Sequence, residues 1–146
     1  AADYPAAVLG LNATVQTNKR KIAADDFFKG MYETALAADE IITAVSFPIP
    51  KKAAYVKFPN PASRFALVGV FVAQAGGGVR VAVTGAAPHV HRATAIEAAL
   101  GRSFTADAAK AAKIPADALN TDLHGSAEYR AHLVSVLAGR AVAAAG

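Results

Sequence analysis

The amino-acid sequence predicts an α+β fold in which a three-stranded antiparallel sheet packs with about three helices. Residues 53–86 contain three apolar segments with strand-like patterning, separated by turn residues. From Ala93 onward the apolar residues recur at helical spacing instead. The 146 residues are 54% hydrophobic and include 38 alanines, so the composition supports one alanine-rich core of ordinary size.

The first 48 residues carry short elements that we interpret as part of something larger. Pro5 near the start of an apolar segment favours a helix, and alternation followed by a turn at Asn18 favours a hairpin. Asp25 is expected to cap a helical turn that Gly30 ends. The expected elements are a helix over Tyr4–Leu11, strands over Ala13–Thr17 and Lys21–Ala23, the turn through Phe27 and Phe28, and a strand over Glu40–Phe47. Pro48, Pro50 and Lys51-Lys52 then mark an internal boundary.

The segments after this boundary predict the sheet and its helices. The expected strands are Ala53–Phe58, Phe65–Gln74 and Val79–Thr84, with turns at Pro59-Asn60-Pro61 and Gly76–Gly78. A helix should begin near Ala93 and end at Gly101, and Thr105 should cap a second helix that runs through Ala112.

The last helix is the clearest, with Ser126 as its N-cap. The spacing predicts one buried stripe, and it places Glu128, His132, Ser135 and Gly139 on the opposite face. Arg140 would project into this stripe, which favours a structural arginine paired with a carboxylate or with helix-end carbonyls. The predicted stripe consists of Tyr129, Leu133, Val136, Leu137 and Ala141.

Composition excludes several classes of chemistry. The chain has no cysteine, so disulfides, thiolate catalysis and thiolate-ligated clusters are excluded within it. The longest apolar run, residues 65–73, is too short to cross a bilayer, and we expect a cytoplasmic location. Residues 1–48 carry a net charge of −2 and residues 49–146 carry +6. The basic residues are scattered singly and lack interleaved aromatics, which argues against nucleic-acid binding.

The residues alone define no self-contained catalytic centre. His89 and His91 could point to one face of a strand, but no carboxylate lies within five residues of either, so a solvent-facing loop is favoured over a metal site. The serines lack a nucleophile elbow, and the glycines lack phosphate-loop spacing. The acidic pairs Asp25-Asp26 and Asp39-Glu40 are interpreted as caps at the starts of elements.

Six segments, taken in order, carry a resemblance to a known family. They are Ala1–Pro5, Ala23–Gly30, Asp39–Ile42 leading to Pro48, Lys57 with Pro61–Ala66, Arg92-Ala93, and Asp122–Arg130. Together they resemble the FAD-binding (medium) subunit of molybdenum hydroxylases, the carbon monoxide dehydrogenase and xanthine dehydrogenase family. The resemblance implies that residues 1–48 are the C-terminal end of an FAD-binding domain. Residues 49–146 would be the family's α+β C-terminal domain.

The resemblance also implies four cofactor-binding residues. Asp3 would hydrogen-bond the ribityl chain of FAD, Ile42 would lie against the isoalloxazine ring, and Lys57 would reach the flavin edge. By spacing, Phe65 would shield the ring. Without the resemblance these would be a frayed terminal carboxylate, a core residue, a solvated strand-end charge and a core aromatic.

The implied activity is that of an oxidoreductase subunit. Electrons would pass from a molybdenum cofactor in a large subunit, through [2Fe-2S] clusters in a small subunit, to FAD and an external acceptor. Such enzymes are usually dimers of heterotrimers. The family's two glycine-rich FAD loops are absent from these residues, so we expect the isolated chain to bind little FAD and to be inactive alone. The alternative is a non-catalytic docking module without a flavin role, whose basic half contacts partner subunits.

Overall fold

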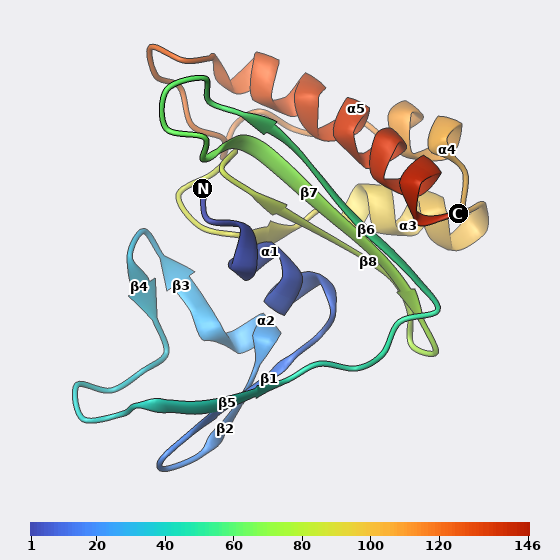
Figure 1. Cartoon of the computed structure of the whole chain (residues 1–146). Coiled ribbons are helices and arrows are strands. Elements are labelled where there is room, and N and C mark those ends of the chain that lie inside the picture. The colour runs from blue at the N-terminus through green and yellow to red at the C-terminus, as the bar shows by residue number, and fades with distance from the viewer.

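The computed structural model describes all 146 residues and shows two packed parts (Figure 1). The C-terminal part, residues 49–146, is built on a four-stranded antiparallel sheet with the order β6-β7-β8-β9. Helices α3, α4 and α5 cover one face of this sheet, and α1 from the N-terminal part lies against the other (Figure 1). The bounds are β6 Lys52–Pro59, β7 Ala66–Ala75, β8 Gly78–Thr84, β9 His91–Arg92, α3 Thr94–Arg102, α4 Ala106–Ala111, α5 Ala127–Ala145 and α1 Asp3–Gly10.

The predicted α+β class is confirmed, and the meander of three strands lies where the alternation placed it. The β6–β7 register runs from Lys52 opposite Gln74 to a shift near Pro59. The short turn between β7 and β8 places Gly78 at a φ of +111°, a conformation that glycine adopts readily. Strand β9 adds a fourth strand of only two residues, which is too short for periodicity to reveal.

The main core lies between the sheet and its three helices. Alternate residues of β7 and β8 point toward the helices, as the two-residue period of a strand requires. Since α1 covers the opposite face, the intervening residues of β7 are largely buried as well. The 17 residues of this core are Leu67, Val68, Val70, Val72, Val81, Val83, Ala86, Ala93, Ile96, Leu100, Ala109, Leu133, Val134, Leu137, Ala138, Ala141 and Val142.

Helix α5 begins as predicted but buries a wider arc than one stripe. Ser126 Oγ accepts a hydrogen bond from Tyr129 N at 3.2 Å, which confirms the N-cap. Tyr129 is nevertheless 42% exposed. The helix packs against both the sheet and α4, so Gly139 is buried against Lys110 of α4, contrary to the prediction. Arg140 is exposed, so its predicted place in the stripe is also wrong.

The buried arginine of this helix is Arg130, ten residues earlier. Its Nη1 donates to the carbonyls of Leu67 at 2.8 Å and Gly85 at 3.0 Å. Its Nη2 donates to Asp122 Oδ2 at 2.7 Å. Arg130 therefore ties the sheet and the loop before α5 to the helix.

The N-terminal part, residues 1–48, contains smaller elements around α1. Strands β1 (Thr14–Thr17), β2 (Lys21–Ala23) and β5 (Ile42–Ser46) form a sheet with the order β2-β1-β5. The predicted hairpin and strand are thus confirmed. A single helical turn, α2 (Ala24–Phe27), leads into the hairpin of β3 (Phe28–Gly30) and β4 (Glu33–Thr34). Phe28 therefore opens a strand and does not belong to the predicted helical turn.

Asp25 joins the two parts and does not cap α2, whose N-cap residue Ala23 makes no side-chain bond. Arg80 of β8 donates to both oxygens of Asp25, and Arg92 lies 3.6 Å from it. Arg80 also donates to the carbonyl of Leu9 at the end of α1. The hydrogen bonds from Arg80 hold the pKa of Asp25 below the ordinary value. The carboxylate that local spacing assigns to a cap thus makes a long-range contact.

No helix of the structure combines the length and the hydrophobicity that crossing a bilayer requires.

Candidate functional site

Two strand residues and one helix residue form a polar cluster where the two parts meet. Asp3 lies in the first turn of α1, and its Oδ1 accepts a hydrogen bond from Tyr55 Oη at 2.6 Å. Its Oδ2 accepts one from Lys57 Nζ at 2.8 Å. Tyr55 and Lys57 are two residues apart on β6 and therefore point to the same face. We call Asp3, Tyr55 and Lys57 the Asp3 cluster.

The neighbouring strand makes room for Tyr55. The Tyr55 ring stacks on Phe71 of β7 with centroids 6.3 Å apart, and the Tyr55 hydroxyl lies over Gly69 of the same strand. A Cβ at Gly69 would be 2.2 Å from Tyr55 Oη, so a side chain at this position would displace the phenol. Sequence reasoning missed Tyr55, although its spacing of two from Lys57 was an available signal.

The charges of the cluster are fixed by its hydrogen bonds. Partial burial alone would raise the pKa of Asp3, but the hydrogen bonds from Lys57 and Tyr55 outweigh it and lower that pKa. Burial, together with the adjacent carboxylate, raises the pKa of Tyr55 well above its ordinary value. Asp3 is therefore a carboxylate and Tyr55 a neutral phenol at neutral pH. The Asp3 side chain is 48% exposed, so a ligand can reach it.

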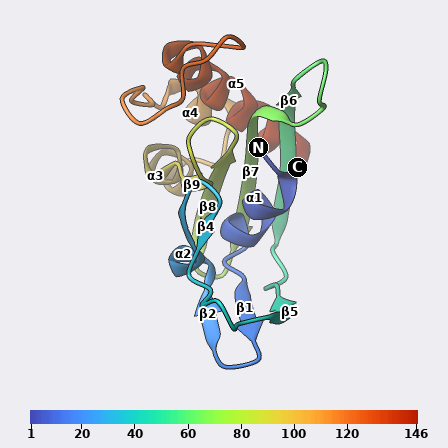
Figure 2. The same cartoon turned by 90° about the vertical axis from the view of Figure 1, so that its left-hand side faces the viewer.

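The other two predicted site residues lie outside the cluster. Ile42 begins β5, which lies toward the lower end of the molecule, well below the N-terminus, in both views (Figures 1 and 2). Phe65 precedes β7 and lines an open cavity of about 800 Å³ together with Ala1 and Ala2. Ile42 is 43% exposed and Phe65 is 57% exposed, so neither is an ordinary core residue. The structure brings together only Asp3 and Lys57 of the four.

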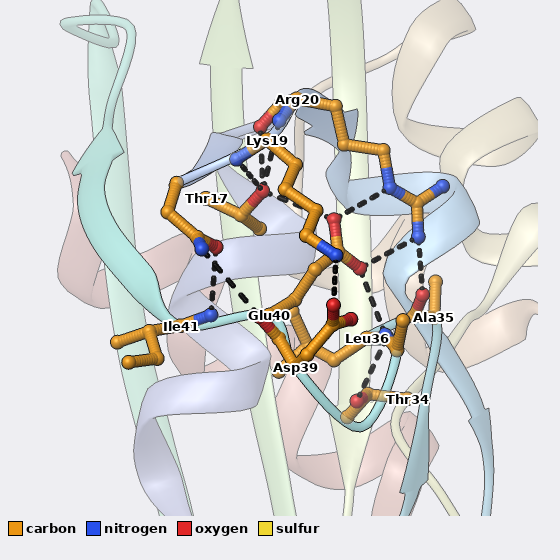
Figure 3. A network of polar contacts seen from close by, with 11 residues as sticks. Thr17, Lys19, Arg20, Thr34, Ala35, Leu36, Asp39, Glu40 and Ile41 are labelled. Atoms are coloured by element: carbon orange, nitrogen blue, oxygen red, sulfur yellow. Dashed lines mark hydrogen bonds and ion pairs between the residues drawn. The ribbon is translucent and has the colours of Figure 1, made fainter.

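A second polar network holds the segment that leads into Ile42 (Figure 3). The Glu40 side chain is 1% exposed and accepts hydrogen bonds from Arg20 Nε at 2.8 Å and Nη2 at 2.9 Å. It also accepts from Thr17 Oγ1 at 3.1 Å and from Ala37 N at 2.8 Å. We call Thr17, Arg20, Ala37 and Glu40 the Glu40 network. Glu40 is therefore an ion-paired anchor between elements, whereas its sequence context had indicated a cap.

Arg20 is the main electrostatic partner of Glu40. Its hydrogen bonds, assisted by the Ala37 N–H, lower the pKa of Glu40 to about 2. The same contact raises the pKa of Arg20. This pair therefore stays ionised through the neutral and mildly acidic range.

Asn18 in the turn between β1 and β2 binds the main chain of Ile41. Its Oδ1 accepts from Ile41 N at 3.0 Å, and Asn18 N donates to Ile41 O at 3.0 Å. Beside it, Lys19 and Asp39 form an exposed ion pair (Figure 3). The turn between β1 and β2 therefore contacts the segment before β5 on both sides of Glu40, at Asp39 and at Ile41.

Comparison with solved structures places this fold in a class. A carbon monoxide dehydrogenase from Hydrogenophaga pseudoflava that lacks the Mo-pyranopterin moiety matches with a TM-score of 0.80 and 32% identity, over 98% of this chain and 55% of that chain. The fold is thus that of the α+β domains found in carbon monoxide dehydrogenase.

The sequence comparisons then define the family. The chain belongs to the CO dehydrogenase flavoprotein C-terminal domain family, whose model matches residues 53–145. A second model, the FAD binding domain in molybdopterin dehydrogenase, matches residues 1–50. These matches confirm the predicted resemblance.

Two curated relatives extend the match over nearly the whole chain. The nicotine 6-hydroxylase medium subunit of Paenarthrobacter nicotinovorans is 37% identical over all of this chain and 56% of its own length. The carbon monoxide dehydrogenase medium chain of Hydrogenophaga pseudoflava is 29% identical over 98% of this chain and 55% of its own length. The chain spans about half the length of the curated relatives it matches.

Proposed function

We propose that this chain forms part of the FAD-binding medium subunit of a molybdenum hydroxylase. Electrons would pass from molybdenum through [2Fe-2S] clusters in partner subunits to FAD, and then to an external acceptor. The observation that carries the proposal is the Asp3 cluster. It joins a segment that matches an FAD-binding family model to one that matches the CO dehydrogenase flavoprotein model.

The chemistry of the Asp3 cluster fits a flavin. A carboxylate offers about four lone-pair positions, and Asp3 uses two of them in these hydrogen bonds, so it can also accept from ribityl hydroxyls. The Lys57 ammonium has three N–H donors and gives one to Asp3, which leaves donors for a flavin carbonyl.

Each residue then has a distinct proposed task. FAD supplies an electron carrier that accepts and releases electrons reversibly. Lys57 places a positive charge beside the ring, which favours its more negative reduced form. Asp3 orients the ribityl chain and Tyr55 orients Asp3. These three residues are in contact, so the proposed site rests on the Asp3 cluster, which joins residues 1–48 to residues 49–146.

The direct test is to tag the chain at its C-terminus in its native host and isolate the complex that it enters. We expect about one FAD per tagged chain, with molybdenum and iron in co-purified partner subunits. FAD is measured after acid release, and the metals by elemental analysis. A complex without flavin would overturn the proposal.

Lys57→Ala tests the site within that complex. We expect a lower flavin content or a lower flavin reduction potential, because the ring loses its adjacent positive charge. The matched control is Lys52→Ala on the same strand, where the ammonium lies 5.8 Å from the Phe104 ring. Unchanged flavin together with loss of subunit association in Lys57→Ala would indicate a docking module and contradict the proposal.

A further inference from the structure

The main chain that leads into Asp3 is held by the sheet, whereas the Asp3 side chain is not held by its own helix. Thr84 Oγ1 of β8 donates a hydrogen bond to Ala2 O at 3.0 Å. Helix α1 has no side-chain hydrogen bond at its N-cap residue Ala2, and the Asp3 side chain bonds only Tyr55 and Lys57. The direction of the Asp3 carboxylate therefore depends on these two residues of β6.

Tyr55 is the partner that packing holds in place. Its ring stacks on Phe71 at an interplanar angle of 28°. A Cβ at Gly10 would lie 2.6 Å from Phe71 Cδ1, so the end of α1 packs directly against the same Phe71 ring. The Tyr55 ring and α1 thus share one aromatic support, and the Tyr55 hydroxyl reaches Asp3 from a fixed position.

Lys57 approaches the same carboxylate with much more freedom. Its side chain is long and partly exposed, and an exposed ion pair of this kind fixes little geometry. Gly69 stands opposite Lys57 in the β6–β7 register, and the Tyr55 hydroxyl occupies the space that the missing Gly69 side chain leaves. The Tyr55 hydroxyl and Lys57 Nζ therefore reach Asp3 side by side, one on each carboxylate oxygen.

This sharing of the carboxylate leaves Lys57 with donors to spare. A lysine that meets a carboxylate alone can donate to both oxygens, which uses two of its three N–H groups. Here Tyr55 Oη bonds Oδ1 of Asp3 at 2.6 Å, and Lys57 donates to Oδ2 alone. Two N–H groups of Lys57 then remain for a ligand, and its positive charge is less closely neutralised.

We propose that Tyr55 is a positioning residue that holds Oδ1 of Asp3 and thereby keeps the positive charge of Lys57 directed at the flavin. The inference rests on the proposed function, because it requires a bound flavin. Without the phenol, Lys57 turns toward both oxygens of Asp3, and the positive charge beside the flavin is weakened. Tyr55 does not contact the flavin and acts only through Asp3 and Lys57.

The test is Tyr55→Phe in the isolated complex, because phenylalanine keeps the ring and its stacking on Phe71 and removes only the hydroxyl. We expect a lower midpoint potential of the flavin, since Lys57 pairs more closely with Asp3 and stabilises the reduced flavin less. The FAD dissociation constant should rise about tenfold, the scale of one hydrogen bond to a charged group. A spectroelectrochemical titration gives the potential, and the fluorescence of released FAD gives the dissociation constant.

A second background separates positioning from a direct role. In an Asp3→Ala complex, Tyr55→Phe should lower the flavin potential no further, because Tyr55 then has no carboxylate to hold. Tyr129→Phe is the matched control: it removes the hydroxyl of an exposed ring that packs edge-on to Phe58, and its flavin should equal that of the wild type. An unchanged flavin potential in Tyr55→Phe, or an equal fall in the Asp3→Ala background, would overturn the inference while the proposed function stands. Absence of flavin from the wild-type complex would instead remove the proposed function.

Discussion

The two parts of the molecule are stabilised in different ways. The C-terminal part has a core of 17 buried apolar residues between its sheet and helices. The N-terminal part has a cluster of nine, and two of these, Ala82 and Val90, belong to the other part. Six of the eleven large exposed apolar side chains lie within residues 1–48. The N-terminal part therefore depends more on its neighbour and on ion pairs such as Arg20–Glu40 and Arg80–Asp25.

This difference matters for the site, because the proposed flavin residues come from both parts. Lys57 and Tyr55 lie on a strand of the larger core, whereas Asp3 and Ile42 belong to the smaller part. Strand β6, which pairs with β7 of the larger core, carries the Lys57 side chain. The Asp3 carboxylate is held by Tyr55 and Lys57, whereas the segment before Ile42 is held by the Glu40 network. Substitutions that weaken each part separately test this difference in stability.

The largest effect is expected in the main core. Leu137→Ala, at a side chain 1% exposed, should lower the free energy of unfolding by about 4 kcal/mol, because the surrounding helices and sheet cannot close the cavity. Leu9→Ala, at 4% exposure in the smaller cluster, should cost about 2 kcal/mol, because less packing surrounds it. Urea unfolding of the 146-residue chain measures both. Equal losses would contradict the proposed difference between the two parts.

The second effect concerns the one buried charge of α5. Arg130→Met removes the donors to the carbonyls of Leu67 and Gly85 and should cost about 3 kcal/mol. Arg140→Met is the control on the same helix and should change stability by less than about 0.5 kcal/mol, because Arg140 is exposed. Thermal and urea unfolding give the comparison. A similar loss for both variants would show that the contacts of Arg130 add little.

The contrast between these two arginines shows what sequence reasoning could predict. The strands of residues 53–84 and the caps Thr105 and Ser126 were correct, because their signals are local. The burial of Arg130 depends on Leu67, Gly85 and Asp122, which lie outside α5 and leave no trace in the spacing of α5 alone. The predicted stripe was therefore correct at Leu137 but wrong at Tyr129.

The site shows the same division between local and distant signals. The family resemblance pointed to Asp3 and Lys57, but not to their ion pair or to the hydrogen bond from Tyr55, which lies 52 residues from Asp3. The partner of Asp25 is 55 residues away and that of Glu40 is 20 residues away. Local spacing assigned both carboxylates to caps because only the folded chain brings their arginines near.

A smaller effect is expected at the boundary between the two parts. Gly69→Ala places a Cβ 2.2 Å from Tyr55 Oη and 2.9 Å from Thr84 Cγ2, so the phenol must move away from Asp3. Overpacking of this kind should cost about 2 kcal/mol. Gly101→Ala is the control, because its Cβ would meet nothing within 4 Å. Urea unfolding measures both, and a Gly69→Ala chain as stable as the wild type would show that Tyr55 is free to move.

The last effect concerns the Glu40 network and disappears in acid. The pKa of Glu40 is lowered from 4.5 to about 2, so the folded chain holds its carboxylate charged where the unfolded chain would protonate it. Its stabilising contribution is therefore fully present above about pH 5 and is lost as pH falls toward 2. The urea midpoint of Glu40→Gln should lie below that of the wild type at pH 7, and the gap should close between pH 5 and 2. Glu33→Gln, on an exposed side chain of β4, is the control and should show no such gap. A gap that stays constant down to pH 2 would mean that the charge of Glu40 does not hold the segment. The N-terminal part would then owe its order to apolar packing, as the C-terminal part does.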